Sequence, residues 1–389
     1  MISYGKQFID QTDIDTVVEV LKGNWLTQGP KVEEFEHVLK NKFGAKYCCA
    51  VANGTAALHL AALALGWKPG DIVITSPITF LATVNSIVYA GATPDFVDID
   101  PVSYTIDANQ VEEKIKVYQS KGKNVKAVIG VDYAGHPCDW EALRSIADRY
   151  KIQLVNDNSH ALGACYKGAH NYATKYANAV IQSFHPVKHI TTGEGGAILT
   201  NDSRIDEKIR LLRTHGMTSN SNIMDKHDGQ WYYEMVDLGY NYRITDFQCA
   251  LGISQLDKLG NFIDRRKKIA QNYNEAFIND DRFIVPFVNS NVNHAYHLYP
   301  LQVRFDKTSV SRIQLFDEMM KINIKLQVHY IPVHLQPYYR KKFGFNENNF
   351  PIAEKFYLNE ISLPVFFELS EKEISSLIEG IDRILINKM

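Results

Sequence analysis

Residues 179–196 read Ala-Val-Ile-Gln-Ser-Phe-His-Pro-Val-Lys-His-Ile-Thr-Thr-Gly-Glu-Gly-Gly. The run at 179–184 is short and largely apolar, Pro186 interrupts regular strand pairing, and Gly195-Gly196 precedes a second apolar run at 197–199. This pattern predicts two buried strands joined by a tight loop that carries Lys188. Loops between core strands are common positions for catalytic groups.

Lys188 is therefore a candidate for a lysine inside a site. A lysine removed from water has a lowered pKa and can act as a nucleophilic amine, which suits Schiff-base chemistry with a carbonyl compound or with pyridoxal phosphate. The alternative is an ordinary surface lysine near a turn, because most lysines are exposed.

Asp157 follows the apolar segment 152–155, so it is expected at the carboxyl edge of a sheet, where open α/β folds bind ligands. A carboxylate there can keep the pyridine nitrogen of pyridoxal phosphate protonated, which makes the ring an electron sink. The alternative role for Asp157 is to cap a following helix.

A phosphate cradle is predicted where the strand-like segment 46–51 meets a helix at residues 56–65. The turn between them is Asn53-Gly54-Thr55, and small or hydroxyl residues at a helix start leave free N–H groups for an anion. The same turn could be a plain helix cap. Phe80, further along, could lie flat on an aromatic cofactor ring or pack in the core.

Apolar strands and amphipathic helices alternate from about residue 45 to residue 200, which predicts an α/β fold with a largely parallel sheet between helices. Two long helices are expected from 245 to 277, then a smaller α+β domain with strands at 297–303 and 324–330 and a last helix at 371–386. The length of 389 residues also favours two domains. We place an N-terminal segment and large domain at 1–260, and connecting helices with a small C-terminal domain at 261–389.

Several segments together resemble the DegT/DnrJ/EryC1/StrS family of nucleotide-sugar aminotransferases. That resemblance implies a pyridoxal-phosphate enzyme of the aspartate aminotransferase fold, fold type I. The segments that carry it extend over most of the chain, at residues 25–30, 53–58, 91–100, 157–163, 183–196, 213–216 and 238–246.

The resemblance also implies roles for individual residues. Lys188 would bind the cofactor covalently, Asp157 would pair with its pyridine nitrogen, and Phe80 would stack on its ring. A phosphate site would be made by Thr55, Ser183 and the amide of Ala56, and His160 would lie beside the ring. Asn241 would reach the phosphate from the partner subunit, which implies a homodimer with shared active sites.

The intact lysine favours transamination. A related sugar 3-dehydratase has histidine at the position where the aminotransferases have lysine. In this chain Lys188 occupies that position, and His189 is the next residue. Freed from the cofactor, the lysine amine would act as the base that moves a proton in each half-reaction.

Residues 183–188 and 328–339 resemble the branch that makes the 4-amino precursor of pseudaminic acid. This implies transfer of an amino group, with L-glutamate as the usual donor, to the C4 keto group of a UDP-linked 4-keto-6-deoxy-N-acetylhexosamine.

Two other functions stay open. The chain could aminate another nucleotide 3- or 4-keto sugar, or it could be a regulatory protein that binds pyridoxal phosphate or a sugar nucleotide without catalysis. A nicotinamide-dependent dehydrogenase lacks its main signal, because no G-x-G-x-x-G follows the first strand.

Substrate contacts are expected from the C-terminal part of the chain and from two arginines. Tyr330, His334 and Tyr338 are suited to hydrogen-bond a diphosphate or to pack on a sugar or uracil ring, although aromatic residues in such a tract are as often core. Arg213 and Arg243 could bind an anion or form structural salt bridges. The shared motif at residues 25–30 adds Thr27 to the predicted contacts.

Composition excludes several other classes. With 42 Lys and Arg against 44 Asp and Glu, the chain lacks the basic field of a nucleic-acid-binding protein, and the basic cluster at 264–268 is expected on a solvated helix face. The uncharged stretches 48–67 and 72–94 are broken by polar and turn residues, so we expect core rather than membrane. The N-terminus has no long apolar centre typical of a signal peptide.

The cysteines and histidines indicate neither disulfides nor a metal. Five cysteines without C-x-x-C spacing fit a reducing cytoplasm. The histidines at 294, 297, 329 and 334 have no carboxylate-rich motif beside them, so substrate contacts or core positions are expected for them.

Overall fold

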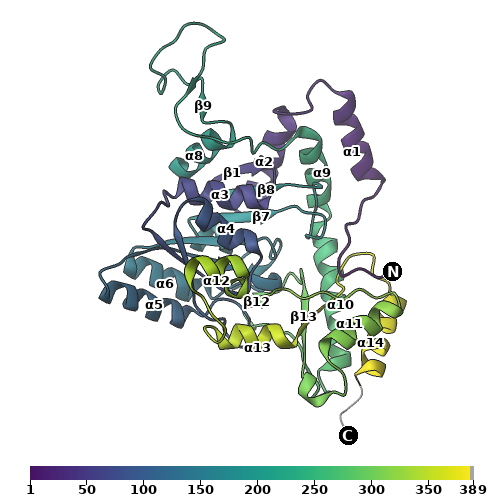
Figure 1. Cartoon of the computed structure of the whole chain (residues 1–389). Helices are drawn as coiled ribbons and strands as arrows, with labels where there is room; N and C mark the ends of the chain where they lie inside the picture. The colour runs from purple at the N-terminus through teal and green to yellow at the C-terminus, as the bar shows by residue number, and fades with distance from the viewer. Residues whose placement is uncertain (386–389) are drawn as a thin grey trace.

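The computed structural model describes residues 1–385 and contains a central seven-stranded sheet (Figure 1). The strand order is β1-β8-β7-β5-β4-β2-β3; β8 runs antiparallel to both neighbours, and the other neighbouring pairs are parallel. The largely parallel sheet predicted from sequence is confirmed. Its strands are β1 (Tyr47–Val51), β2 (Ile72–Thr75), β3 (Thr93–Phe96), β4 (Val125–Val131), β5 (Gln153–Asp157), β7 (Ala179–Ser183) and β8 (Gly196–Thr200).

Helices cover both faces of this sheet, so its strands are apolar on both sides. In β5, Leu154 packs into the cluster that contains Trp140, whereas Val155 packs into the opposite cluster with Leu60. Successive strand residues point to opposite faces, which explains this alternation. The covering elements are α3 (Gly54–Ala64), α4 (Leu81–Tyr89), α5 (Ala108–Ser120), η1 (Tyr133–Gly135), α6 (Trp140–Tyr150), α7 (Tyr172–Tyr176) and α8 (Ser203–Arg213).

The two long helices predicted after residue 245 are present as α9 (Asp246–Asp257) and α10 (Leu259–Phe277). The N-terminal helices α1 (Gln11–Lys22) and α2 (Pro30–Lys42) pack against α9. Buried Asp13 of α1 accepts hydrogen bonds from Ser254 and Gln255 of α9, at 2.6 Å and 2.7 Å. The N-terminal segment is therefore tied to the helix that leads out of the sheet.

The C-terminal part contains a second, antiparallel sheet made of β11 (Phe283–Ile284), β13 (Tyr299–Val303) and β14 (Glu360–Leu363). The predicted strand at 324–330 is wrong, because this segment forms only isolated bridges, Ile2 with Ile324 and Gln327 with Ser362. The other elements here are β12 (Val292–Asn293), η2 (Phe305–Lys307), α11 (Arg312–Lys321), η3 (Val333–Leu335), α12 (Pro337–Phe343), α13 (Pro351–Asn359) and α14 (Glu371–Ile384).

The division at residue 260 stays a prediction. Residues from both sides of it share one apolar cluster, in which Phe96 and Tyr133 pack with Tyr339 and Phe356. β12 likewise pairs with β6 (Cys165–Tyr166). The last predicted helix is confirmed as α14 up to Ile384, whereas its proposed end at residue 386 and positions 387–389 of the proposed domain lie outside the described residues.

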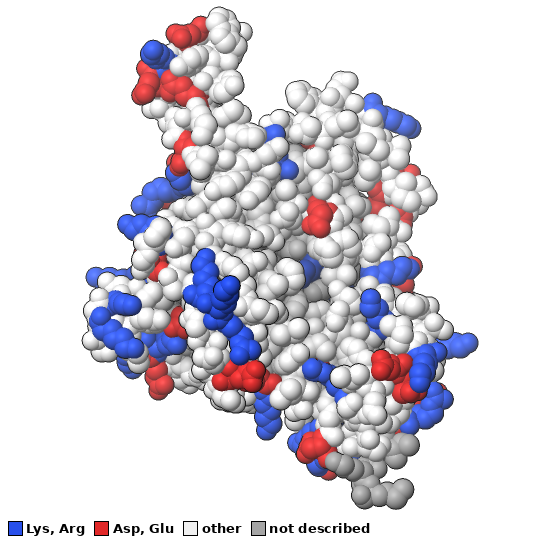
Figure 2. Space-filling model, viewed as in Figure 1, with Lys and Arg blue, Asp and Glu red and all other residues white. Residues whose placement is uncertain are grey.

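A hairpin arm made by β9 (Met217–Thr218) and β10 (Glu234–Met235) projects from the body (Figure 1). Figure 2 shows charged side chains of both signs around a mostly uncharged centre, with a dense group of Lys and Arg over α12. Within residues 1–385, every helix is too short or too polar to cross a lipid bilayer. In the same residues, no group of three or more His, Cys, Asp or Glu side chains is arranged to hold a metal ion.

Candidate active site

A cavity of about 590 Å³ opens at the carboxyl ends of the parallel strands and gathers most of the predicted cofactor residues. Side chains from β5, β7, α3 and α4 meet there with the loop after β7 and the segment before η3. Open α/β sheets bind ligands at this edge. Of the predicted cofactor residues, those that line the cavity are Thr55, Phe80, Asp157, His160, Ser183 and Lys188.

Asp157 is the last residue of β5 and is 6% exposed. Its Oδ2 accepts a hydrogen bond from Thr83 Oγ1 at 2.7 Å, and its Oδ1 accepts from Ser159 Oγ at 2.6 Å and Ser159 N at 3.2 Å. Thr79 lies four residues before Thr83, just ahead of α4, and the two hydroxyl oxygens are 2.8 Å apart. No helix follows directly, so Asp157 does not have the helix-capping role that was the alternative. These bonds fix the orientation of a carboxylate that faces the cavity.

Lys188 lies in the loop between β7 and β8, as predicted, and its side chain lines the cavity. Burial lowers the pKa of Lys188 from 10.5 to about 8; the Asp157 charge opposes this shift, and the charge of Arg266 adds to it. Nζ is 3.4 Å from His297 Nε2. The alternative of a solvated surface lysine does not fit this position. An amine with a pKa near 8 can donate or accept a proton close to neutral pH.

The start of α3 forms an anion cradle. Asn53 caps the helix by accepting from the amide of Ala56 at 2.8 Å, while the N–H groups of Gly54 and Thr55 have no acceptor within residues 1–385. Free amides at a helix start bind anions. The predicted phosphate contact of the Ala56 amide is not supported, because Asn53 already uses this donor.

Two glycines let the cradle approach the ends of β7 and β8. A Cβ atom at Gly54 would lie 3.0 Å from Ser183 Cβ, and one at Gly196 would lie 2.5 Å from the carbonyl carbon of Asn53. Thr55 and Ser183 both line the cavity, and Ser183 Oγ would lie 3.2 Å from a Cβ atom at Gly54, the residue before Thr55. Glycine is required where backbones come this close.

His160 and Tyr330 form a second wall. His160 Nδ1 accepts from the amide of Ala134 at 3.3 Å, so its other ring nitrogen carries the proton and donates to the Tyr330 hydroxyl at 3.1 Å. Burial holds the pKa of His160 well below 6.5 and raises that of Tyr330 above 10. Both side chains are therefore neutral, and their rings present flat faces.

Phe80 precedes α4 and is 56% exposed, with its ring 6.0 Å from that of Tyr330. An exposed phenylalanine on the cavity wall does not fit the alternative of core packing. Its position suits contact with a planar ring.

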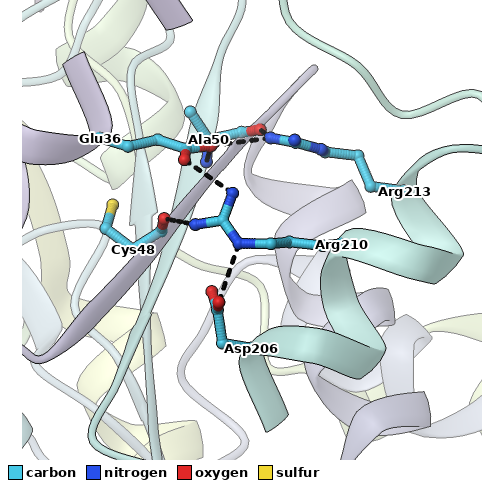
Figure 3. Close-up of polar contacts among 6 residues, drawn as sticks. All are labelled: Glu36, Cys48, Ala50, Asp206, Arg210 and Arg213. Carbon is cyan, nitrogen blue, oxygen red and sulfur yellow. Dashed lines mark hydrogen bonds and ion pairs between the residues drawn. The ribbon is translucent and has the colours of Figure 1, made fainter. Parts of the chain in front are cut away.

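Arg213 lies in a buried ion network rather than in the cavity (Figure 3). Its Nη1 donates to Glu36 Oε1 at 2.7 Å and to the carbonyl of Ala50 at 2.8 Å. Arg210 donates to the other oxygen of Glu36 at 2.8 Å. The predicted anion contact of Arg213 is therefore corrected to a structural ion pair, the alternative noted from the sequence.

Two predicted aromatic contacts also lie elsewhere. His334 is fully buried, with Nε2 3.0 Å from Glu354 and its ring against Phe350, so it is a core residue. Tyr338 is 53% exposed and borders a separate shallow groove beside α4. Their positions do not support the predicted substrate contacts, whereas Tyr330 does line the cavity.

Three other predicted residues lie outside the lining of this cavity. Asn241 and Thr27 are exposed, and Arg243 is half-buried without a side-chain hydrogen bond to any residue in the range 1–385. Their predicted roles are not tested by a single protomer. Asn241 is accessible to a second copy of the chain, which its predicted role requires.

Sequence reasoning missed Thr83 and Ser159, which hold Asp157. A hydroxyl two residues after an aspartate is a frequent local hydrogen-bond pattern, so Ser159 had a signal in the sequence. Thr83 had none, because its contact with Asp157 joins positions 74 residues apart.

The groups in this cavity fit pyridoxal phosphate. The free amides at the start of α3 and the nearby hydroxyls suit its phosphate, the fixed Asp157 suits its pyridine nitrogen, and the amine of Lys188 suits its aldehyde. The flat side chains of Phe80 and His160 suit the two faces of its ring.

Comparison with known proteins agrees with this arrangement. The family model described as the DegT/DnrJ/EryC1/StrS aminotransferase family matches residues 7–382. The spore coat polysaccharide biosynthesis protein SpsC of Bacillus subtilis is 38% identical over 99% of this chain and 97% of its own length.

Two further proteins are similar over nearly their whole length. The UDP-4-amino-4,6-dideoxy-N-acetyl-β-L-altrosamine transaminase of Campylobacter jejuni is 39% identical over 96% of this chain and 94% of its own. The PLP form of Spr1654 from Streptococcus pneumoniae superposes with a TM-score of 0.88 at 30% identity, covering 98% of this chain and 97% of that one.

Proposed function

This chain belongs to the DegT/DnrJ/EryC1/StrS aminotransferase family, and from that premise we propose which substrates it uses. The amino group comes from an amino acid, L-glutamate, and goes to the C4 keto group of a UDP-linked 4-keto-6-deoxy-N-acetylhexosamine. The product is UDP-4-amino-4,6-dideoxy-N-acetyl-β-L-altrosamine, used for pseudaminic acid or a related surface glycan. The name of the Campylobacter jejuni relative supports this substrate.

The observation on which the proposal depends is the meeting of Lys188, Asp157 and the α3 cradle in one cavity. When bound, pyridoxal phosphate would supply an electron sink for the negative charge left when a proton is removed from the carbon beside the transferred amino group. The cradle and Ser183 would hold the phosphate, and Asp157 would pair with the pyridine nitrogen. Phe80 and His160 would enclose the ring.

Lys188 performs the proton transfers in this proposal. Its pKa of about 8 leaves part of the amine neutral near neutral pH, so Nζ can take the proton from Cα of the amino-acid donor in the first half-reaction and deliver a proton to C4 of the sugar in the second. Between the two steps, the transferred proton would be held on the bound cofactor. Thr83 and Ser159 keep the Asp157 carboxylate oriented throughout, so little reorganisation is needed while charge moves on the ring.

A homodimer with shared active sites, acting in the cytoplasm, is part of the proposal. Asn241 is exposed and does not line the cavity of its own protomer, which is compatible with a contact to a partner's cofactor. Mixed dimers of an Asn241→Asp variant and a Lys188→Ala variant test this. Each parent dimer would be impaired, whereas one site of a mixed dimer would combine an intact Lys188 with an intact Asn241 from the other subunit. Shared sites predict partial recovery of activity in the mixed dimers, and independent sites predict none.

The direct test is an absorbance spectrum of the purified protein before and after addition of L-glutamate, beside Lys188→Ala. The proposal expects a visible cofactor band that bleaches in the natural protein and persists in the variant. Adding the UDP-4-keto sugar should then restore the band and yield the 4-amino sugar. A protein that stays colourless with added pyridoxal phosphate would support the non-catalytic alternative.

Bleaching without turnover of this sugar would instead favour a different nucleotide sugar. The similarity to SpsC, at 38% identity over nearly the whole chain, makes this the second candidate. A panel of 3-keto and 4-keto nucleotide sugars, assayed for recovery of the cofactor band, separates the two.

A further inference from the structure

His329 lies on the cavity wall beside β14 and takes no part in the chemistry described above. The segment that carries it bonds to β14 at one point, where Ser362 N donates to the carbonyl of Gln327 at 2.7 Å. In this antiparallel pairing, His329 lies two residues after Gln327, and Glu360 lies two residues before Ser362. The three side chains therefore share one face.

These side chains form a hydrogen-bonded row. His329 Nδ1 is 2.8 Å from Ser362 Oγ, the Ser362 hydroxyl contacts Glu360 Oε1, and Glu360 Oε2 accepts from the amide of His329 at 2.9 Å. His329 is 7% exposed, and its Nε2 has no partner among residues 1–385 and is not sealed from solvent. Because His329 lines the cavity, Nε2 is the ring nitrogen available to a bound molecule.

The surroundings of Glu360 favour its protonated acid form. The side chain is 0% exposed, and its carboxyl contacts only a hydroxyl and an amide. The guanidinium of Arg312, on α11, binds the main-chain carbonyls of Tyr357 and Glu360 instead. A buried carboxylate without a cation is costly, and burial raises the pKa of Glu360 to about 8.

The other titratable groups facing this row are neutral or lower the proton affinity of His329. Tyr133 donates its hydroxyl to the carbonyl of His329, and burial raises the pKa values of Tyr133, Tyr330 and Tyr4. Burial, with a contribution from the charge of Lys188, lowers the pKa of His329 to about 3. The imidazole is therefore neutral and holds one proton.

The position of that proton follows from the row. A protonated Glu360 would donate to Ser362 Oγ across the Ser362–Glu360 contact, and the Ser362 hydroxyl would then donate to His329 Nδ1. A nitrogen that accepts a hydrogen bond carries no proton of its own. The single imidazole proton is then on Nε2, which presents a donor to the cavity.

We propose that His329 is a substrate-contact residue whose Nε2–H donates to an oxygen atom of the bound substrate, with Ser362 and Glu360 as positioning residues. The proposal rests on the proposed function, because it assigns a contact in the same cavity. Two substrates bring suitable oxygen acceptors: the carboxylate of the amino-acid donor and the keto sugar nucleotide. The two half-reactions distinguish them.

The experiment compares His329→Phe, His329→Gln, Ser362→Ala and Glu360→Gln with the natural protein. Phenylalanine keeps a ring but has no donor, whereas glutamine restores an N–H near Nε2. Ser254→Ala is the matched control, since Ser254 is a buried serine that donates to a buried carboxylate away from the cavity. Each variant is assayed for its cofactor spectrum and for the KM of L-glutamate and of the keto sugar separately.

Loss of one hydrogen bond to a charged or polar acceptor predicts a rise in one KM of about 10-fold or more in His329→Phe, with partial recovery in His329→Gln. Ser362→Ala should raise the same KM by about 3-fold to 10-fold, and Ser254→Ala should leave it unchanged. Glu360→Gln keeps a donor to Ser362, so it should retain the natural KM. A change confined to glutamate assigns the donor carboxylate, and one confined to the sugar assigns the nucleotide sugar.

A second measurement does not depend on turnover. Nitrogen-15 NMR of histidine-labelled protein, with His329 assigned by the signals lost in His329→Gln, should show the proton on Nε2 in the natural protein and a shifted signal in Ser362→Ala. A proton on Nδ1, or unchanged KM values in His329→Phe, would overturn this proposal. Failure of the natural protein to transaminate would refute the proposed function while leaving the NMR result to test the positioning of the ring.

Discussion

Glu36 is the centre of a buried ion network, and its replacement gives a sharp test of how this fold is held together (Figure 3). The Glu36 side chain is 8% exposed and accepts from Arg210, Arg213 and the amide of Ala50, at 2.8 Å, 2.7 Å and 2.9 Å. The network joins α2 and α8 to β1, the strand that leads to the α3 cradle. We consider Glu36→Gln, which keeps the size of the side chain and removes its charge.

The expected loss follows from the burial of each partner. Removing one member of a buried ion pair typically costs about 3–5 kcal/mol. The Arg210 side chain is 39% exposed and keeps its pair with Asp206, so its share is screened by water. Arg213, 16% exposed, keeps only the carbonyl of Ala50. We therefore expect the low end of that range, about 3 kcal/mol.

Thermal unfolding of the cofactor-saturated protein at one fixed concentration measures this loss. An unfolding entropy of about 2.1 cal/mol/K per residue gives about 0.8 kcal/mol/K for this chain, so about 3 kcal/mol lowers Tm by about 4 °C. Glu34→Gln is the matched control on the same helix, because the Lys31–Glu34 pair is exposed, 35% and 47%, and should cost well under 1 kcal/mol. Equal Tm values for the two variants would show that Glu36 contributes no more to stability than an exposed carboxylate.

Three further predictions concern the site and its supports. Thr83→Val removes the hydroxyl that donates to Asp157, so kcat/KM from steady-state kinetics should fall about 10-fold to 100-fold, whereas Thr83→Ser should stay near the natural value. Equal kcat/KM values for the two variants would contradict this role of the hydroxyl. Gly196→Ala places a Cβ 2.5 Å from the Asn53 backbone, so titration with pyridoxal phosphate should show an affinity reduced about 10-fold or more. Gly260→Ala is the control and should bind the cofactor normally, because its new Cβ meets nothing within 4 Å. The pKa of Glu360 is raised in the folded state, from 4.5 to about 8, so its contribution to stability is fully present below pH 4.5 and is lost as the pH rises towards 8. Urea unfolding at several pH values should therefore show the natural protein losing stability relative to Glu360→Gln across this interval. Parallel curves of stability against pH for the two proteins would contradict the assigned protonation.

Much of the fold and the centre of the site could be predicted because they depend on local patterns. Apolar runs bounded by turns identified β5, β7 and β8, and alternation with helices implied a parallel sheet. The carboxyl ends of parallel strands meet at one edge of the sheet, so Asp157 was expected at the edge where such folds bind ligands. The resemblance to a family then gave Lys188, Phe80 and Thr55 their predicted roles.

The segment 324–330 shows where local pattern was insufficient. Its composition predicted a strand, yet it touches β14 through one bridge and instead brings His329 and Tyr330 to the cavity. Strand formation requires a continuous partner, and no local signal shows whether one is available. His334, five residues after His329, enters the core because Phe350 and Glu354 surround it.

Local sequence pattern was sufficient to predict the alternation of strands and helices between about residues 45 and 200, the loop that presents Lys188 and the strand end that carries Asp157, because short-range periodicity and turn residues govern these features. Only the tertiary structure decided that Arg213 pairs with Glu36, 177 positions away, that Thr83 orients Asp157, and that His329 is held by β14. Polar groups satisfy their hydrogen bonds with whichever partners the folded core brings near them, and those partners are distant in the chain.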